Sequence, residues 1–361
     1  MAYTTIDDGS AYFHAQLFTG NDATDRAITN DANAGDFKPD WLWLKNRDSA
    51  STNMTFDSSR LTSSEATLSL RANATNAEAD KVDVFGGFET DGFTVDGSDS
   101  DTNSNGHKVV AWQWKANGGT QTHSQSESGS NIACSVQANT TAKFSIITYT
   151  GTGGAGHTFL HGLGSTPKVI LIKIRTGATR GWIVYHHKSH ATPHENFTLL
   201  NTAAGVADLD RFDDTAPNST EIAVSDDTHV NADGNTYVAY AFDEVKGYSK
   251  FGSYIGNGNA DGAFVYTGFK PAFVIQKQTS ADGEYWMMKD SAREPHNQAD
   301  VNFYPNANNV EGDTNGIDFL SNGFKCRTTG AGSNASDATY IYMAWAESPF
   351  VSSEGVPTTA R

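Results

Sequence analysis

The sequence predicts an all-β protein of three tandem repeated antiparallel β-sandwich units, jelly-roll-like and about 100 residues each. Three observations favour this fold class. The chain of 361 residues contains 34 glycines and many Ser, Thr, Asn and Asp residues, which are typical of short strands joined by turns. No long stretch has the spacing of apolar residues that an amphipathic helix requires. One pattern of strands also occurs three times along the chain.

The repeated pattern begins with a proline at the entrance of an apolar strand that ends in lysine. The lysine follows the proline by six residues in every copy. Proline is tolerated at the first position of a strand, because its missing N–H is not needed for the central ladder there. The three strands are Phe37–Lys45, Ser165–Lys173 and Phe269–Lys277.

Other strands surround this one at matching positions. Upstream of each proline lies a strand that ends in a glycine turn, at 17–21, 148–151 and 253–257. A strand is expected in the middle of each unit, at 91–95, 221–224 and 322–326. An aromatic strand closes each unit, at 109–114, 237–242 and 340–345. We expect its last aromatic residue, 75, 75 and 74 residues after the proline, to anchor a core in each unit: Trp114, Phe242 and Trp345.

This spacing divides the chain into three units with connecting and terminal segments. Residues 118–142 are rich in Gly, Ser, Thr and Gln and predict a linker that is either flexible or laid over a surface. Only the six residues 245–250 join the second unit to the third. We therefore expect these two units to form one rigid body that carries a more separately placed first unit. The expected segments are an extended N-terminal arm (1–15), unit 1 (16–117), the linker (118–142), unit 2 (143–246), unit 3 (247–347) and an extended C-terminal tail (348–361).

Charge and cysteine content exclude several classes of protein. The net charge of −17 repels phosphate backbones, so no nucleic-acid partner is expected. No apolar run approaches the ~20 residues that cross a bilayer, so no membrane insertion is expected. The first residues have neither the basic nor the apolar part of a secretory signal. The two cysteines, Cys134 and Cys326, are therefore expected to be reduced and buried.

Several stretches of the chain resemble a family of uncharacterised virion structural proteins of marine bacteriophages, of the tail or appendage type. They are TIDDGSAYF (5–13), YVAY (237–240), EVKGYSKFGSY (244–254), FVYTGFKP (264–271) and FLSNGFK (319–325). The resemblance covers nearly the whole chain and implies a structural component of a phage particle, made in the host cytoplasm. It implies no catalytic residue, because that family has no established active site.

We therefore expect a non-enzymatic virion protein on the external surface of the particle, with the tail favoured over the head. The favoured role is a tail fibre or another adhesin-type appendage. A capsid decoration protein or head fibre is the first alternative, and a carbohydrate-binding or polysaccharide-degrading appendage is the second. The expected partners are other virion proteins, further copies of the chain in a homo-oligomer (a trimer is favoured) and a host surface glycan.

The run HHKSHATPHE holds four of the eleven histidines and raises the question of a zinc or nickel site. Alignment of the repeat places His187 at an aspartate position of the sister units and His190 at an arginine position. The run therefore predicts a pH-sensitive variant of a polar surface turn, with a metal site as the alternative. The aligned residues of units 1 and 3 are Asp57, Asp290, Arg60 and Arg293. The candidate ligands are His186, His187, His190 and His194.

Acidic and amide residues that precede the closing strands form a second candidate metal site. Asp99, Asp101 and Asn103 resemble the start of a calcium loop. An EF-hand is excluded, because glycine is missing from the sixth position and Val110 stands where a bidentate Glu is required. Turn chemistry is the favoured interpretation, and Ca²⁺ binding is the alternative. Matching residues in units 2 and 3 are Asp226, Asp227, Asn231, Asp233, Asn334 and Asp337.

Trp41 and Trp43 form the last candidate. They alternate with Leu42 and Leu44, so two indoles share one face of a strand. Burial under an opposing sheet or a neighbouring subunit is the favoured interpretation, and a sugar-stacking platform for a glycan is the alternative. No catalytic residue and no cofactor-binding residue is predicted, because no motif of a hydrolase or metalloprotease is present.

Overall fold

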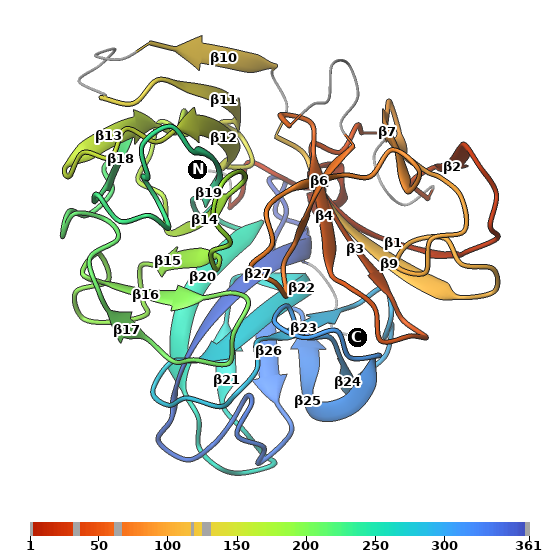
Figure 1. The fold of residues 1–361 in the computed structure, drawn as a ribbon. Helices are drawn as coiled ribbons and strands as arrows, with labels where there is room; N and C mark the ends of the chain where they lie inside the picture. Colours follow the sequence, from red (N-terminus) through yellow and green to blue (C-terminus); the bar gives the residue numbers. More distant parts are fainter. Residues whose placement is uncertain (1–2, 32–36, 61–66, 117–118, 125–130, 358–361) are drawn as a thin grey trace.

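The computed structural model describes residues 3–31, 37–60, 67–116, 119–124 and 131–357. Figure 1 shows three groups of strands, coloured red to orange, yellow to green and cyan to blue, around a common centre. The predicted all-β class is confirmed: the sheets are antiparallel, and the helical structure in the described residues is one 3₁₀ turn, η1 (Gly9–Ala11). None of the described helical structure is long and apolar enough to span a membrane.

Unit 1 is a sandwich of a large and a small sheet. The large sheet has the order β1 (Phe13–Thr19), β9 (Lys108–Trp114), β3 (Trp41–Asn46), β4 (Met54–Asp57), β5 (Leu68–Arg71) and β6 (Ala79–Asp80). The small sheet has the order β2 (Arg26–Ile28), β8 (Gly92–Val95) and β7 (Phe85–Glu89). Leu42, Leu44, Phe56, Phe85 and Phe93 are buried between the two sheets.

Unit 2 has the same two-sheet arrangement, with two additional strands at one edge of the large sheet. Its large sheet has the order β10 (Thr120–His123), β11 (Cys134–Asn139), β12 (Phe144–Thr150), β19 (Thr236–Phe242), β14 (Val169–Ile174), β15 (Ile183–His186), β16 (Asn196–Leu199) and β17 (Ala207–Asp208). The small sheet pairs β13 (His157–Leu160) with β18 (Glu221–Val224). The expectation of a bare linker at 118–142 is wrong for its described part, because β10 and β11 extend the large sheet.

Unit 3 is a sandwich of two four-stranded sheets. Its large sheet has the order β20 (Ser249–Ile255), β27 (Thr339–Pro349), β22 (Phe269–Gln278) and β23 (Met287–Asp290). Its small sheet has the order β21 (Phe264–Tyr266), β26 (Gly323–Cys326), β25 (Gly312–Leu320) and β24 (Ala299–Asn302). In all three units the first strand pairs with the closing strand, which in turn pairs with the strand that carries the repeated lysine.

The register of these pairs gives equivalent positions in the three units. Trp41 lies opposite Trp114, Val169 opposite Phe242, and Phe273 opposite Trp345. Since side chains alternate along a strand, every second residue points into its own sandwich and the others point out of it. The outward side chains of the three large sheets meet at the centre of the molecule.

One hydrophobic core joins the three units there. Trp41 of unit 1 stacks on Tyr240 of unit 2, with ring centroids 4.5 Å apart. Trp112 of unit 1 stacks on Phe273 of unit 3 at 5.4 Å, and Phe242 of unit 2 meets Trp345 of unit 3 at 5.6 Å. The expectation of a separately placed unit 1 is therefore wrong. The predicted core anchors Trp114, Phe242 and Trp345 are buried, at most 2% exposed.

The described parts of both terminal segments pack on unit 3. The Tyr3 hydroxyl and the Phe350 N–H both donate to the Gly268 carbonyl of unit 3, at 2.8 and 3.2 Å. Asp7 accepts the Ser353 N–H at 2.6 Å, which joins the two segments to each other. Strand β27 continues to Pro349, beyond the predicted end of unit 3. The described residues of both segments therefore do not extend away as arms, because they pack on the body of the same chain.

Candidate functional site

Three junctions between the units surround the central core, and each closing strand contributes one polar contact to a neighbour. The Tyr240 hydroxyl of unit 2 donates to Asp57 Oδ2 of unit 1 at 2.6 Å. Trp112 Nε1 of unit 1 donates to Asp290 Oδ2 of unit 3 at 3.1 Å. His186 Nε2 of unit 2 lies 3.1 Å from the Tyr342 carbonyl of unit 3, to which it donates. The contacts therefore close a ring of three units.

The junction between units 1 and 2 holds a buried ion network. Arg60 Nε lies 2.5 Å from Asp57 Oδ2, and its Nη1 lies 3.5 Å from Glu78 Oε2. Arg175 of unit 2 donates to both oxygens of Glu78, at 2.9 and 3.0 Å. Burial opposes the charge of Arg60, but Asp57 and Glu78 outweigh burial and raise its pKa. The network joins the two units through charge-assisted hydrogen bonds.

The same network occurs between units 3 and 1. Arg293 Nε lies 2.6 Å from Asp290 Oδ2, and its Nη1 lies 3.6 Å from Glu311 Oε2. Arg47 of unit 1 donates to Glu311 at 2.8 Å. Four charged residues thus hold this junction in the order found at the first one.

The junction between units 2 and 3 carries uncharged residues at these positions. His186 lies opposite Val169, where Asp57 and Asp290 lie opposite the equivalent residues of their strands. Ser189 takes the arginine position, three residues further on. Val206 and Thr279 take the places of the glutamate and of the second arginine, since Val206 N–H donates to the Thr279 carbonyl at 3.3 Å. Glu78 and Glu311 make the equivalent backbone bond, to the carbonyls of Arg175 and Arg47.

The repeated lysine, six residues after the proline, donates across a junction in units 2 and 3 and within its own unit in unit 1. Lys173 Nζ donates to the Thr75 carbonyl of unit 1 at 3.0 Å, and Lys277 Nζ donates to the Ala203 carbonyl of unit 2 at 3.1 Å. Lys45 Nζ donates to the carbonyl of its neighbour Asn46 at 3.0 Å. Burial lowers the pKa of each lysine to about 8.

The histidine run lies at the uncharged junction and in the loop beside it. His186 is fully buried, and burial lowers its pKa to about 3, so the ring is neutral. His187 Nε2 donates to the Phe251 carbonyl at 2.7 Å, whereas His190 is exposed and bonds to Asn196 Nδ2 at 3.0 Å. His194 is half-buried. No group of three or more His, Cys, Asp or Glu residues that could hold a metal occurs in the part of the chain that the structure describes.

Two expectations about this run are corrected. His186, and not His187, occupies the aspartate position, because the strand register places Asp57, Asp290 and His186 at equivalent points. The run is also no surface turn where it begins, since His186 and His187 donate to carbonyls of unit 3. The sequence alignment was one residue out of register, and the arginine position belongs to Ser189 instead of His190.

The acid and amide loops are held by their own side chains. Asn103 is fully buried, and its Nδ2 donates to the Ala23 carbonyl at 2.9 Å and the Gly97 carbonyl at 2.8 Å. Asp101 accepts the N–H and the hydroxyl of Thr52, both at 2.8 Å, and Asp99 accepts the Asp101 N–H at 2.8 Å. The buried Asn231 and Asn334 make the same kind of bonds in units 2 and 3. These contacts are turn chemistry.

Trp41 and Trp43 lie in the central core. They are 2% and 1% exposed, and Trp43 Nε1 donates to Asn53 Oδ1 at 3.1 Å. The alternative of a sugar-stacking platform is therefore wrong, because neither indole face reaches solvent. Both cysteines are buried, as predicted, and the described residues contain no disulfide.

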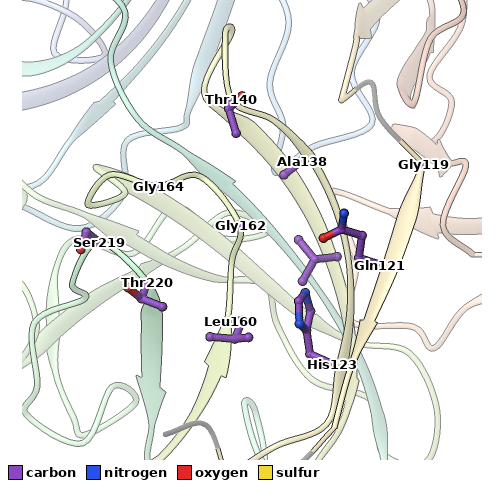
Figure 2. A pocket seen from close by; sticks show the side chains of 11 residues that line it. Gly119, Gln121, His123, Ala138, Thr140, Leu160, Gly162, Gly164, Ser219 and Thr220 are labelled. Atoms are coloured by element: carbon purple, nitrogen blue, oxygen red, sulfur yellow. The ribbon is translucent and has the colours of Figure 1, made fainter. Parts of the chain in front are cut away.

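An open pocket of about 380 Å³ lies in unit 2, between the β10–β11 hairpin and the small sheet. Figure 2 shows Gln121 and His123 on one side of it and Leu160 and Thr220 on the other. Val136 and Ala138 contribute further apolar surface. None of the described residues that line it is Asp, Glu, Lys or Arg, although 19% of the chain is charged. Such a pocket suits a neutral ligand better than an ion.

Sequence reasoning missed this pocket because one wall of it comes from residues assigned to a linker. The other wall depends on Gly162, whose φ is +71° and whose Cβ, if present, would lie 2.8 Å from Val136 Cγ1. The sequence offered only the glycine itself as a signal, since glycine is the residue that tolerates positive φ and close approach to another strand.

The comparisons with known proteins identify a family whose function is unknown. A family model described as "Domain of unknown function (DUF7483)" matches residues 8–349. No curated protein and no solved structure matches the chain.

Proposed function

The chain belongs to the DUF7483 domain family, and from its residues and geometry we propose that it is a non-enzymatic structural component of a bacteriophage particle. The favoured role is an external appendage of the tail, of the fibre or adhesin type. The proposal combines the resemblance of the sequence to phage virion proteins with the way the repeated residues are used.

The observation that carries the proposal is the shared core of the three units. The residues that recur in all three units, such as the closing aromatics and the buried lysines, lie at the centre and at the junctions. They join three sandwiches into one body and leave the outer loops free to differ. A rigid body with variable outer surfaces suits a spacer or an attachment module of a particle better than an enzyme with one specialised cleft.

The uncharged pocket of unit 2 supports the adhesin role among the structural ones. Its polar rim of Gln121, His123, Thr140 and Ser219 offers hydrogen bonds to hydroxyl groups, and Leu160 offers an apolar contact. A neutral sugar of a host surface glycan presents both kinds of surface. A polysaccharide-degrading appendage remains the second candidate, since the same pocket would bind its substrate.

The location is tested by immunogold labelling of purified phage particles with antibody against this chain. We expect label on the tail. Label on the head alone would favour a decoration protein or head fibre, and unlabelled particles would contradict a virion role. Light scattering of the purified chain tests the proposed homo-oligomer, for which a trimer mass is expected and a monomer mass is the contrary result.

The non-enzymatic assignment is tested by incubating the chain with host surface polysaccharide. We expect no oligosaccharide to be released. The variant Thr220→Glu places a charge at an exposed position of the pocket wall and is expected to weaken glycan binding without changing unfolding. Released oligosaccharide that this variant abolishes would make the chain an enzyme and the pocket its active site.

A further inference from the structure

The interior of the unit 3 sandwich contains a lysine where the other two units contain an aromatic residue. Lys289 lies opposite Val274, as Phe56 lies opposite Leu42 and Tyr185 opposite Ile170. Lys289 is 1% exposed, and lysine is almost never fully buried unless it is paired. No ion pair of the described residues includes it, and its Nζ donates to the Thr314 carbonyl at 3.3 Å. Burial lowers its pKa to about 7, so much of it is a neutral amine near neutral pH.

The residue across from Lys289 is an asparagine. Met288 and Phe303 form an antiparallel bridge with both backbone hydrogen bonds, at 2.8 and 3.1 Å. In this antiparallel register Lys289 lies opposite Asn302, one residue further along. Their side chains therefore project on the same face of the two paired segments. Asn302 is fully buried, and its Nδ2 donates to Thr314 O, the carbonyl to which Lys289 Nζ also donates. The Asn302 Oδ1 atom has no hydrogen-bond partner.

A carboxyl group adjoins this pair. Glu294 lies on the connection between β23 and β24, and its Oε2 accepts the N–H of Val301, next to Asn302, at 2.7 Å. Burial raises the pKa of Glu294, and among the neighbouring charges Glu294 acts most strongly on Lys289. An acid close to both an amine and an amide can move protons between them.

We propose that Lys289 and Asn302 form an isopeptide bond that joins β23 of the large sheet to β24 of the small sheet in unit 3. The neutral Nζ attacks Asn302 Cγ, and the bond between Cγ and Nδ2 breaks. Glu294 accepts a proton from Nζ and delivers a proton to the leaving nitrogen, which departs as ammonia. The oxidation states do not change, so no oxidant or cofactor is needed.

The bond accounts for two features of the site. It removes a buried ionisable amine, and it retains one N–H for Thr314 O. The other units lack the reacting pair: Phe56 and Ser69 stand at these positions in unit 1, and Tyr185 and Phe197 in unit 2. Unit 3 is also the unit on which both terminal segments pack, through Tyr3 and Phe350 at the Gly268 carbonyl.

The intact mass of the purified chain under denaturing conditions tests the proposal. We expect a mass below the sequence mass by one molecule of ammonia, and a protease digest that contains one branched peptide linking Lys289 to Asn302. The full sequence mass after prolonged incubation at neutral pH would overturn the proposal. Because the wild-type mass decides, the test does not depend on how well any variant folds.

Variants assign the roles of the three residues. Lys289→Met and Asn302→Ser should each restore the full sequence mass, calculated for the variant. Glu294→Gln should slow the mass change at least tenfold in freshly folded protein, without preventing folding. Lys277→Met is the matched control, because Lys277 is also buried but lies opposite Ile341 instead of an asparagine. This control should keep the mass loss, and its disappearance there would contradict the assignment to Lys289.

Discussion

The two junctions that unit 1 makes with its neighbours contain buried ion networks, and the junction between units 2 and 3 does not. The backbone contacts at the three junctions are equivalent, and all three border one aromatic core. What differs is a set of four positions, occupied by Asp, Arg, Glu and Arg in two junctions and by His, Ser, Val and Thr in the third. Burial of the aromatic core is therefore the common source of cohesion, and the networks are specific to unit 1.

This difference has an energetic consequence. A buried ion pair gains little over a well-packed apolar pair, but removal of one partner is costly because the remaining charge has no compensation. The junctions of unit 1 should therefore be sensitive to single substitutions, whereas the third should be tolerant of substitution and sensitive to pH.

The largest expected effect is that of Arg60→Met. It leaves Asp57 and Glu78 at the junction without the guanidinium that joins them, and a loss of about 3–5 kcal/mol in the free energy of unfolding is expected. Urea unfolding followed by tryptophan fluorescence measures it. Ser189→Ala, at the equivalent position of the uncharged junction, is the control and should change stability by less than about 0.5 kcal/mol. Equal effects of the two substitutions would contradict the distinction.

The next effect concerns the polar contact of a closing strand. Trp112→Phe removes the N–H that donates to Asp290, and a loss of about 1–3 kcal/mol is expected. Met343 follows the same pattern in unit 3, two residues before the closing aromatic, so Met343→Leu should cost less than about 1.5 kcal/mol. The same unfolding experiment compares them. A Met343→Leu that costs as much as Trp112→Phe would show that packing, and not the lost N–H, accounts for the effect.

The pH dependence should separate the third junction from the others. His186 has a pKa of about 3 in the folded chain against 6.5 as the ordinary value, so between these values the unfolded chain binds a proton that the folded chain does not. Stability is therefore complete above pH 6.5 and is lost as the pH falls toward 3, by about 1.4 kcal/mol per pH unit for this one group. His186→Gln should reduce the slope of unfolding free energy against pH by that amount. An unchanged slope would mean that His186 is not buried at the junction.

The smallest expected effect is that of metals. Since the loop asparagines bond to backbone carbonyls and the histidines to unit 3, addition of zinc or calcium and treatment with a chelator should leave the melting temperature unchanged. A rise with zinc that His187→Ala abolishes would restore the histidine site. A rise with calcium that Asp101→Asn abolishes would do the same for the acidic loop.

Much of the fold could be predicted because local signals repeated. Three prolines, three lysines and three closing aromatics at constant spacing located the central strands of each large sheet. The strands β10 and β11 could not be predicted in the same way, because they have no counterpart in units 1 and 3 and their sequence is rich in small polar residues. Their pairing depends on the tertiary edge offered by β12.

The site was harder to predict, for reasons of register and of packing between units. An error of one residue in the alignment of the repeats, in the turn after β15, assigned the junction position to His187 instead of His186. No residue in that turn is distinctive enough to fix the alignment. The alternating pattern of Trp41 and Trp43 is the same whether the two indoles face solvent or a neighbouring unit, so the sequence cannot distinguish the two. The pocket of unit 2 depends on two segments that the sequence separates and on a glycine that allows their approach.

Differential scanning calorimetry of the whole chain tests most directly whether the three units share one core. The cluster that contains Trp41, Tyr240, Phe273 and Trp345 is shared by all three units. If one unit unfolds, the core residues of its neighbours therefore become exposed to solvent. We expect one transition, with equal calorimetric and van't Hoff enthalpies. Arg60→Met should lower the temperature of that single transition. Two or more separate transitions, with unit 1 melting apart from units 2 and 3, would contradict a common core.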